Sequence, residues 1–397
     1  MKEFKPLIII NILCFTSLFA FMPIAGPIVR KLFLEEWHAG LIVSLTGLAW
    51  IFLSRFWGKK SDIFGRKNIL LIALVGFFIS YLILAIFIDY AVVNPPLVII
   101  SLTIFTLIRV LNGVFYSAMQ PTSSALIADK IEPSKRNSYM ASLGASSGVG
   151  TVLGSILAGS LAIYGLAVPI YLSTFLLLIA IFILVFFFEK DKKIYQTSKV
   201  NQTNQSLSFF DKRLRLVMFV GFLVTFANIT SQICIGFFVL DKFDLDEEKG
   251  AALIGYIFTI IGVIYILTQL VVSKLKYIKP ISWLLLGSIL AMIGYISILF
   301  ISTKIELTLS YGITTVGFGM LIPAYMAITA NSVESHEQGI AAGSVSSMQG
   351  IAVIVAPLVS TIFYEINLNF PFIFSGISFL ILVFIILFYR KKELYKN

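Results

Sequence analysis

The stretch GKKSDIFGRKN, residues 58–68, places four cations, one aspartate and two glycines within a short segment of an otherwise apolar region. The run AGLIVSLTGLAWIFL precedes it, and the run ILLIALVGFFISYLILAIFI follows it. Runs of this kind approach the roughly 20 apolar residues that a helix needs to cross a bilayer. The stretch is therefore predicted to be a polar loop between two membrane-spanning helices.

The composition of the whole chain indicates a membrane protein. Of its 397 residues, 58% are hydrophobic and 13% are charged, whereas soluble domains carry about 25% charged residues. Both cysteines, Cys14 and Cys234, lie inside apolar runs, so they form neither a disulfide framework nor a metal site. We expect no metal and no cofactor.

The apolar stretches predict an all-α membrane protein with twelve transmembrane helices. They lie near residues 6–29, 38–57, 69–93, 97–127, 138–163, 166–188, 214–240, 250–272, 281–302, 307–331, 340–363 and 369–389. The first continues through Val29 without a cleavage site, which favours a retained span over a signal peptide. The fourth is long and contains Pro121, which predicts a kink or an extension beyond the bilayer.

The basic residues predict the orientation of the chain. If both termini are cytoplasmic, the inner segments hold 24 of the 30 Lys and Arg residues and the outer loops hold 5. Cytoplasmic loops of membrane proteins carry such an excess, so we expect a multi-pass protein of the plasma membrane with both termini inside. The net charge of +10 then lines one membrane face, and it does not indicate nucleic-acid binding.

A polar stretch divides the chain into two parts. We predict a first six-helix half at residues 1–188, a cytoplasmic linker at 189–213 and a second six-helix half at 214–397. The linker is rich in Lys, Ser, Thr, Asn and Gln, a composition typical of a flexible connection.

The two halves carry a weak internal repeat. Residues 125–155 align without gaps on residues 327–357, at a constant offset of 202 residues, and Pro121 then falls on Pro323. Two six-helix halves in parallel repeat, with a site at their interface, are a plan that transporters use.

Specific motifs resemble one family. The pattern Gly58-x-x-Ser61-Asp62-x-x-Gly65-Arg66-Lys67 resembles the signature between spans two and three of the major facilitator superfamily. The run Arg109-Val-Leu-Asn112-Gly113 resembles the span-four signature of its twelve-span drug and metabolite exporters, the drug:proton antiporter branch. The segment from Ala128-Asp129 to Arg136 resembles the loop that follows. The resemblance covers nearly the whole chain.

The first motif is predicted to form a latch between the halves. Its glycines, Gly58 and Gly65, permit a tight turn and close helix approach. Asp62 is an acceptor for a bidentate pair with Arg66, and Asp129 is a second candidate partner. The resemblance implies that this cluster latches the first half against the start of span eleven near Gly339. The lysines of the motif are explained by orientation alone.

Arg109 is the only charged residue deep within a predicted span. Its insertion costs about 2.5–3.5 kcal/mol, so a polar cavity or a partner must compensate. Asn112, Gly113 and Tyr116 lie near it at helical spacing. We interpret the group as part of a substrate or proton pathway, and the alternative is a structural arginine satisfied by carbonyl groups.

Span five carries repeated glycines at Gly148, Gly150, Gly154 and Gly159. Glycines at such spacing permit close helix packing. The run resembles the antiporter motif of the exporters, but Ser155 stands where that motif has proline and Ala158 where it has glycine. Its counterpart in span eleven keeps Pro357. Helix packing and a role in antiport both remain open.

Polar groups of the second half are candidates for lining a substrate pocket. Amide and aromatic side chains can orient a ligand within a mostly apolar site. The candidates are Asn228 and Gln232 in span seven, with Tyr256, Tyr311, Tyr325 and Gln349.

Together these features predict a secondary active exporter of small organic molecules that works by alternating access and proton antiport. No predicted span has an Asp or Glu near its middle, which favours a neutral or anionic substrate such as a carboxylate-bearing metabolite or a siderophore. A drug is the other candidate substrate. The alternative is an importer or uniporter of the same fold. The chain has no phosphate-binding loop and no mid-span catalytic constellation, so we expect no enzyme. We expect a monomer whose partners are its substrate, protons and lipid.

Overall fold

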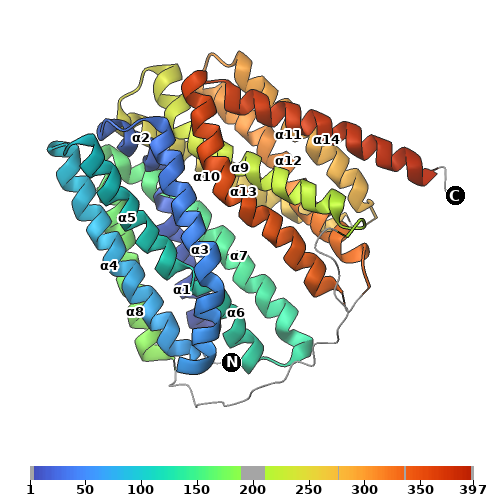
Figure 1. Cartoon of the computed structure of the whole chain (residues 1–397), viewed down its shortest axis with the longest axis horizontal. Coiled ribbons are helices and arrows are strands. Elements are labelled where there is room, and N and C mark those ends of the chain that lie inside the picture. Colours follow the sequence, from blue (N-terminus) through green and yellow to red (C-terminus); the bar gives the residue numbers. More distant parts are fainter. Residues whose placement is uncertain (1–3, 189–210, 276, 335–336, 395–397) are drawn as a thin grey trace. The chain divides into compact units, whose positions relative to one another are not determined.

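The computed structural model describes residues 4–188, 211–275, 277–334 and 337–394. Within these ranges the chain forms helices and no strands (Figure 1). Twelve of the described helical segments are long and apolar enough to cross a membrane, so the predicted all-α class and number of spans are confirmed. Most of the predicted linker at 189–213 lies outside the described residues.

The helices follow the predicted apolar stretches closely. Those of the first six spans are α1 (Phe4–Ala20), α2 (Met22–Lys31), α3 (Glu36–Phe64), α4 (Arg66–Val93), α5 (Val98–Tyr116), α6 (Met119–Lys130), α7 (Pro133–Leu161) and α8 (Val168–Phe187). Those of the last six are α9 (Arg215–Phe243), α10 (Glu247–Lys274), α11 (Pro280–Ser297), α12 (Lys304–Asn331), α13 (Gln338–Ile366) and α14 (Phe370–Leu394).

Two of the spans are broken. The first divides at Phe21 into α1 and α2, just before Pro23. The fourth divides at Ser117 and Ala118 into α5 and α6. Ser117 lies four residues before Pro121, so in a regular helix its carbonyl oxygen would accept a hydrogen bond from the backbone nitrogen of residue 121. Proline removes that hydrogen bond and its ring clashes with that carbonyl, which explains the predicted kink. Pro323, the aligned proline, lies within an unbroken α12.

The chain forms two compact units. Unit 1 comprises Met1–Val200 together with Ile235–Thr259, and unit 2 comprises Asn201–Cys234 together with Ile260–Asn397. The last part of α9 and the first part of α10 therefore pack with the first six spans. The bounds of these units differ from those of the predicted halves, because residues 235–259 pack with the first half.

In unit 1, α4 lies between α5 and α8, and α1 packs against α7 and α8 (Figure 1). The core of α4 includes the fully buried rings of Phe77 and Tyr81, which meet edge to face with centroids 4.7 Å apart. Aromatic pairs in this geometry stabilise a core beyond the area that they bury.

In unit 2, α11 packs against both α12 and α14. A side chain on Gly294 of α11 would lie 2.1 Å from the hydroxyl oxygen of Thr314 and 2.7 Å from its backbone nitrogen. The two helices therefore approach at backbone distance, as small residues allow in membranes. On the other side, the ring of Tyr295 stacks on that of Phe379, with centroids 5.9 Å apart.

We predict that Gly294→Ala destabilises the protein by about 1–3 kcal/mol, the usual cost of overpacking a tight core. The matched control is Gly343→Ala on α13, where an added methyl group meets nothing within 4 Å and should be neutral or stabilising by up to ~1 kcal/mol. Thermal unfolding of the purified protein, followed by tryptophan fluorescence, measures both. Equal transition temperatures for the two variants would contradict this account.

Candidate functional site

Charged side chains in unit 1 gather at two opposite ends of its helices. Consecutive spans run in opposite directions, so the end of the first span and the start of the third lie at opposite ends of the unit. We name them the Arg30 end and the Arg66 end after the arginines that they carry. The charge bias of the sequence predicts that the Arg66 end faces the cytoplasm.

Arg66, the first residue of α4, holds two carboxylates. Its Nη1 lies 2.6 Å from Asp62 Oδ1 at the end of α3, and its Nε donates to Asp129 Oδ2 on α6 at 2.8 Å. It also donates to the hydroxyl of Ser61. The side chain of Arg66 is 15% exposed, against 62% for Asp62 and 41% for Asp129. The structure thus brings together the three charged residues that the motif predicted, and it joins three helices through one guanidinium.

The two glycines of the motif have different structural roles. Gly65 separates α3 from α4 and has φ of +90°, a conformation that side-chain-bearing residues rarely adopt. Gly58 lies inside α3, not in a turn, and a side chain there would meet Pro121 of α6 at 3.9 Å. Only Gly65 makes the turn that the sequence predicted.

Gly339, the other predicted member of the latch, is the second residue of α13 and belongs to unit 2. Close to it in the chain, Glu337 accepts hydrogen bonds at 3.1 Å from both Nη1 and Nη2 of Arg213, which precedes α9. Arg213 also binds Asp211, and its hydrogen bonds to that side chain hold the pKa of Asp211 below its usual value. In unit 2, an arginine thus ties the start of α13 to the start of α9.

Arg109 lies on α5 and is 2% exposed. Its guanidinium carbon is 3.9 Å from the centroid of the Phe21 ring, and the hydroxyl of Tyr81 on α4 lies beside it. Among the described residues, its Nε and Nη1 have no hydrogen-bond partner. A desolvated cation–π contact contributes about 2 kcal/mol, which does not fully offset the cost of a mid-span arginine.

The neighbours of Arg109 on α5 differ in surroundings. The Asn112 carbonyl oxygen accepts a hydrogen bond from Ser80, while its Nδ2 has no partner in the described part of the chain. A side chain on Gly113 would lie 2.6 Å from the carbonyl oxygen of Thr46 on α3, so this glycine permits a close crossing. Tyr116 is buried among the rings of Phe15, Trp50 and Phe77. Gly113 and Tyr116 are thus held by packing within unit 1.

The span-five glycines divide into two groups. Gly150 and Gly154 touch the backbone of α1, and Gly159 touches Gly255 of α10. Gly148 has open space where a side chain would lie, so close packing does not require a glycine there. In unit 2, Pro357 lies inside α13, and its carbonyl oxygen accepts from the hydroxyls of Ser360 and Thr361.

The polar candidates of the second half occur as pairs. In unit 2, Gln232 donates to the side-chain Oδ1 of Asn228. Gln349 donates to the hydroxyl of Tyr325 at 2.8 Å, and Tyr311 donates to the backbone oxygen of Ser231 at 3.1 Å. Tyr256 lies in unit 1 and is 60% exposed, so it is not part of these pairs.

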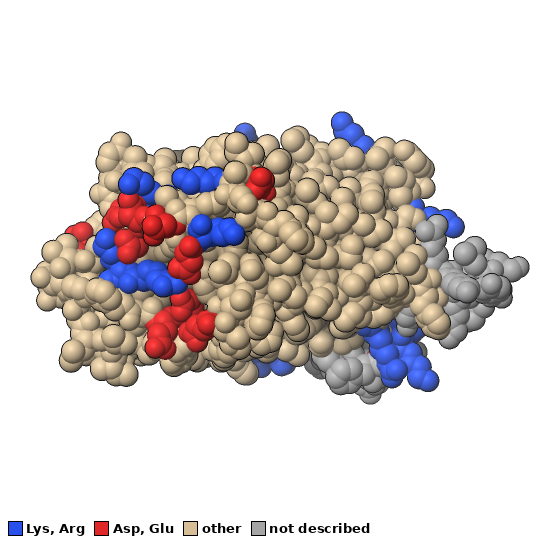
Figure 2. Space-filling model, turned by 90° about the horizontal axis from the view of Figure 1, so that it is seen from above, with Lys and Arg blue, Asp and Glu red and all other residues tan. Residues whose placement is uncertain are grey.

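Sequence reasoning missed the ion pairs of the Arg30 end. Arg30 pairs with Glu36 and, at 2.8 Å, with Asp241 of α9, while Lys31 pairs with Glu247 of α10 at 3.3 Å. Figure 2 shows acidic and basic side chains gathered together on the face seen from above. Each residue looks like an ordinary loop charge in the sequence, and only the fold brings positions more than 200 apart into contact.

At two places in unit 1, a glycine of one helix meets a glycine of another at backbone distance, and we call these contacts glycine crossings. A side chain on Gly26 of α2 would lie 2.7 Å from the backbone of Gly236 on α9. One on Gly159 of α7 would lie 2.7 Å from the Cα of Gly255 on α10. Within unit 1, α9 and α10 are therefore joined to the first six spans at backbone distance and through opposite charges.

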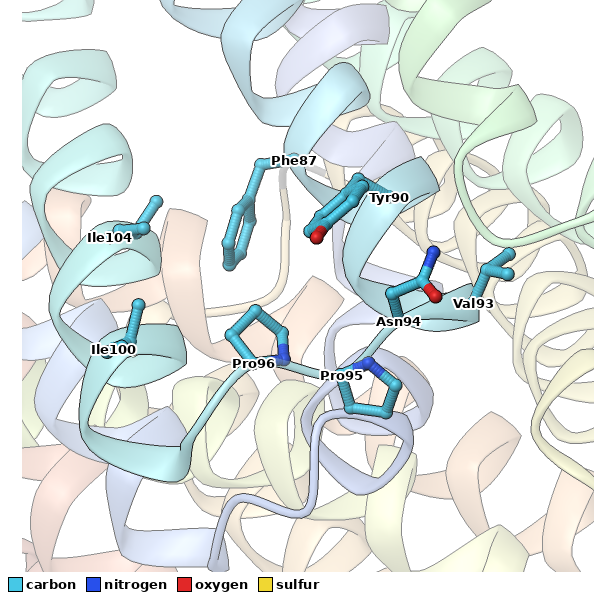
Figure 3. A pocket seen from close by; sticks show the side chains of 8 residues that line it. All are labelled: Phe87, Tyr90, Val93, Asn94, Pro95, Pro96, Ile100 and Ile104. Carbon is cyan, nitrogen blue, oxygen red and sulfur yellow. The ribbon is translucent and has the colours of Figure 1, made fainter.

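A pocket of about 570 Å³ lies where α4 ends and α5 begins. Its wall includes Phe87 and Tyr90 of α4, Pro96 of the connecting loop and Ile100 of α5 (Figure 3). The pocket carries no charged side chain, and none of the predicted pathway residues lines it. It is therefore separate from the Arg109 group.

The chain is similar to known transport proteins over most of its length. The profile of the Major Facilitator Superfamily matches residues 7–357. Multidrug resistance protein 2 of Bacillus subtilis (strain 168) is 23% identical over 390 residues, covering 94% of this chain and 91% of that protein. The class B tetracycline resistance protein of Escherichia coli is 24% identical over 377 residues, covering 92% and 89%.

Solved structures show the same fold. The crystal structure of a POT family transporter in complex with 5-aminolevulinic acid has a TM-score of 0.75 at 13% identity, covering 98% of this chain and 96% of that one. At such identity the likeness supports the architecture alone. From the family match across the spans, this chain belongs to the Major Facilitator Superfamily and is a multi-pass membrane transporter, not an enzyme.

Proposed function

We propose that this transporter exports small neutral or anionic organic molecules from the cytoplasm in exchange for protons. The observation that carries the proposal is the set of contacts at the Arg30 end, where parts of α9 and α10 pack with the first six spans. The drug- and tetracycline-resistance relatives support export. Import or uniport by the same fold is the alternative.

The contacts at the Arg30 end have the properties of a closed gate. They include two backbone-distance glycine crossings and partly exposed ion pairs. Exposed ion pairs contribute only about 0–1 kcal/mol each, so they can separate at little cost when the helices move apart. The glycine crossings allow the helices to pack closely, and the ion pairs fix how α9 and α10 align along the helices of the first six spans.

At the Arg66 end, the Arg66 cluster is the candidate for the opposing latch. Arg66 joins α3, α4 and α6 as one body, and the resemblance of its motif implies contact with the start of α13 near Gly339. A helix N-terminus favours a neighbouring carboxylate. Two contact sets that form in alternation give the two states that alternating access requires.

The charge distribution favours cargo without a positive charge. Arg109 is the sole charged residue near the middle of a span, and the carboxylates of the described spans lie at helix ends. A buried guanidinium repels cations and attracts anions. A neutral drug, a carboxylate-bearing metabolite or a siderophore therefore fits better than a cationic drug.

The test of exchange uses proteoliposomes containing the purified protein with an imposed pH gradient. We expect an acidic exterior, relative to the lumen, to drive efflux of loaded neutral or anionic compounds through molecules whose cytoplasmic side faces the lumen. Collapse of the gradient with a protonophore should remove the stimulation. Efflux that ignores the gradient rules out antiport, and a preference for cations rules out the charge argument.

For the latch, we predict that Asp129→Asn lowers the transport rate more than Asp62→Asn. Asp129 is less exposed and ties α6 to α4, whereas Asp62 pairs with Arg66 across a single turn. The control is Lys59→Gln, which removes one exposed charge near the end of α3. Initial rates at equal protein content measure the effect, and the idea fails if all three variants transport equally.

For the gate, we predict that Gly159→Leu abolishes transport, because a leucine cannot fit against Gly255 at 2.7 Å. Gly148→Leu on the same helix is the matched control, since its side chain enters open space. Normal transport by Gly159→Leu, or an equal loss of transport in Gly148→Leu, would argue against the gate.

A further inference from the structure

We propose that Arg109 is the core of a binding site for a single monovalent anion inside unit 1, taking either chloride or the carboxylate of the cargo. The site deepens the proposed function in that the cargo is one of its two possible ligands. Its existence can be tested without any transport measurement.

The first observation is the set of unpartnered donors. Arg109 is 2% exposed, and its Nε and Nη1 have no acceptor among the described residues. One turn to either side on α5, the hydroxyl of Thr106 and the Nδ2 of Asn112 are also buried without a partner in the described chain. Buried polar groups are normally satisfied. Donors along one helix that lack acceptors need an acceptor from outside the chain.

The second observation is the geometry of the guanidinium. The ring of Phe21 lies 3.9 Å from its central carbon, as in stacking on one face of the planar group. The N–H groups project along the edges of that plane, so stacking on one face leaves the Nε and Nη1 donors free to meet a ligand in the plane. An ionised donor of this kind forms a short, strong hydrogen bond to an anionic acceptor.

The third observation comes from the internal repeat. The offset that relates Pro121 to Pro323 relates Arg109 to Tyr311. In each unit, a tyrosine of a neighbouring span bonds to a serine of the span that opens that half. In unit 1, Tyr81 of α4 donates to the backbone oxygen of Ser17 on α1. In unit 2, Tyr295 of α11 bonds to the hydroxyl of Ser231 on α9, and Tyr311 donates to the backbone oxygen of the same serine.

The comparison separates packing from charge. In unit 2 a neutral tyrosine occupies the position equivalent to Arg109, is buried, and has its hydroxyl satisfied. This point in the fold therefore packs well without a cation. The positive charge in unit 1 is a property that packing does not require, and an anionic ligand explains it.

The experiment uses the full chain, purified into lipid nanodiscs at constant ionic strength and pH. A bulky sulfonate salt is replaced stepwise by chloride in one arm and by acetate in the other, and the unfolding temperature is followed by tryptophan fluorescence. We expect a saturable rise, because a ligand of the native state stabilises it by mass action. If the unfolding temperature rises with chloride alone, the ligand of the site is an inorganic anion. If it rises with acetate, with or without a rise in chloride, the site can bind the carboxylate of the cargo.

The variants test whether Arg109 is responsible. Arg109→Tyr introduces the residue type that Tyr311 has at the equivalent position of unit 2. It should raise the half-saturating anion concentration by roughly 10- to 100-fold, the usual effect of losing a charged hydrogen bond. Arg109→Lys keeps the charge and should bind more weakly than the wild type but more tightly than the tyrosine variant. Arg55→Tyr replaces an exposed arginine and should leave the titration unchanged.

The proposal is overturned if the wild-type unfolding temperature is the same in all three anions, or if Arg109→Tyr and the wild type respond equally. If the tyrosine variant does not fold, the wild-type titration and the lysine variant still decide the matter. Anion binding without gradient-driven efflux would remove the proposed function and keep this site. Gradient-driven efflux without anion binding would remove this site and keep the proposed function.

Discussion

The structure is determined largely by the free-energy cost of placing a charge or an unpaired polar group in the hydrocarbon of the membrane. Arg109 apart, that cost places the charged residues of the described spans toward helix ends, where the Arg30 and Arg66 clusters form. It also requires the polar side chains of the core to bond across helices, as Tyr81 does to Ser17 and Tyr311 to Ser231. Because the middle of the bundle is nearly free of charge, rearrangement of the ends can move the helices without exposing ions to lipid.

The same constraint explains what could be predicted from the sequence. Apolar runs of spanning length predict the helices, since hydrocarbon thickness sets their length. The local motif places Arg66 near Asp62 four residues away, and the position of Asp129 at the cytoplasmic end of span four made it a second candidate partner. Contacts between distant segments have no such local signal. The pairing of Arg30 with Asp241, and the crossing of Gly26 with Gly236, depend on how whole helices pack.

Some polar residues that look alike in sequence have different roles in the fold. Tyr116 and Tyr256 were both candidates for a pathway, but the first is buried among aromatic rings and the second is 60% exposed. Gly148 and Gly150 belong to one glycine-rich run, yet only Gly150 touches another helix. A helix presents a different face every residue, so membership of a motif cannot decide which of its members pack and which do not.

Arg109 is a buried charge whose energetic cost and proposed function are connected. The internal repeat supplies its own control, because Tyr311 shows that the equivalent position packs with a neutral side chain whose hydroxyl is satisfied. An arginine there is therefore more costly than the fold requires. Such a cost is tolerated where a ligand offsets it during part of the transport cycle. An anion bound next to Phe21 would be stabilised most when the site is closed to water, since a low dielectric strengthens its attraction to the guanidinium. Occupancy of the proposed site and closure around it would then favour each other, and the binding of cargo would be coupled to the movement of the helices.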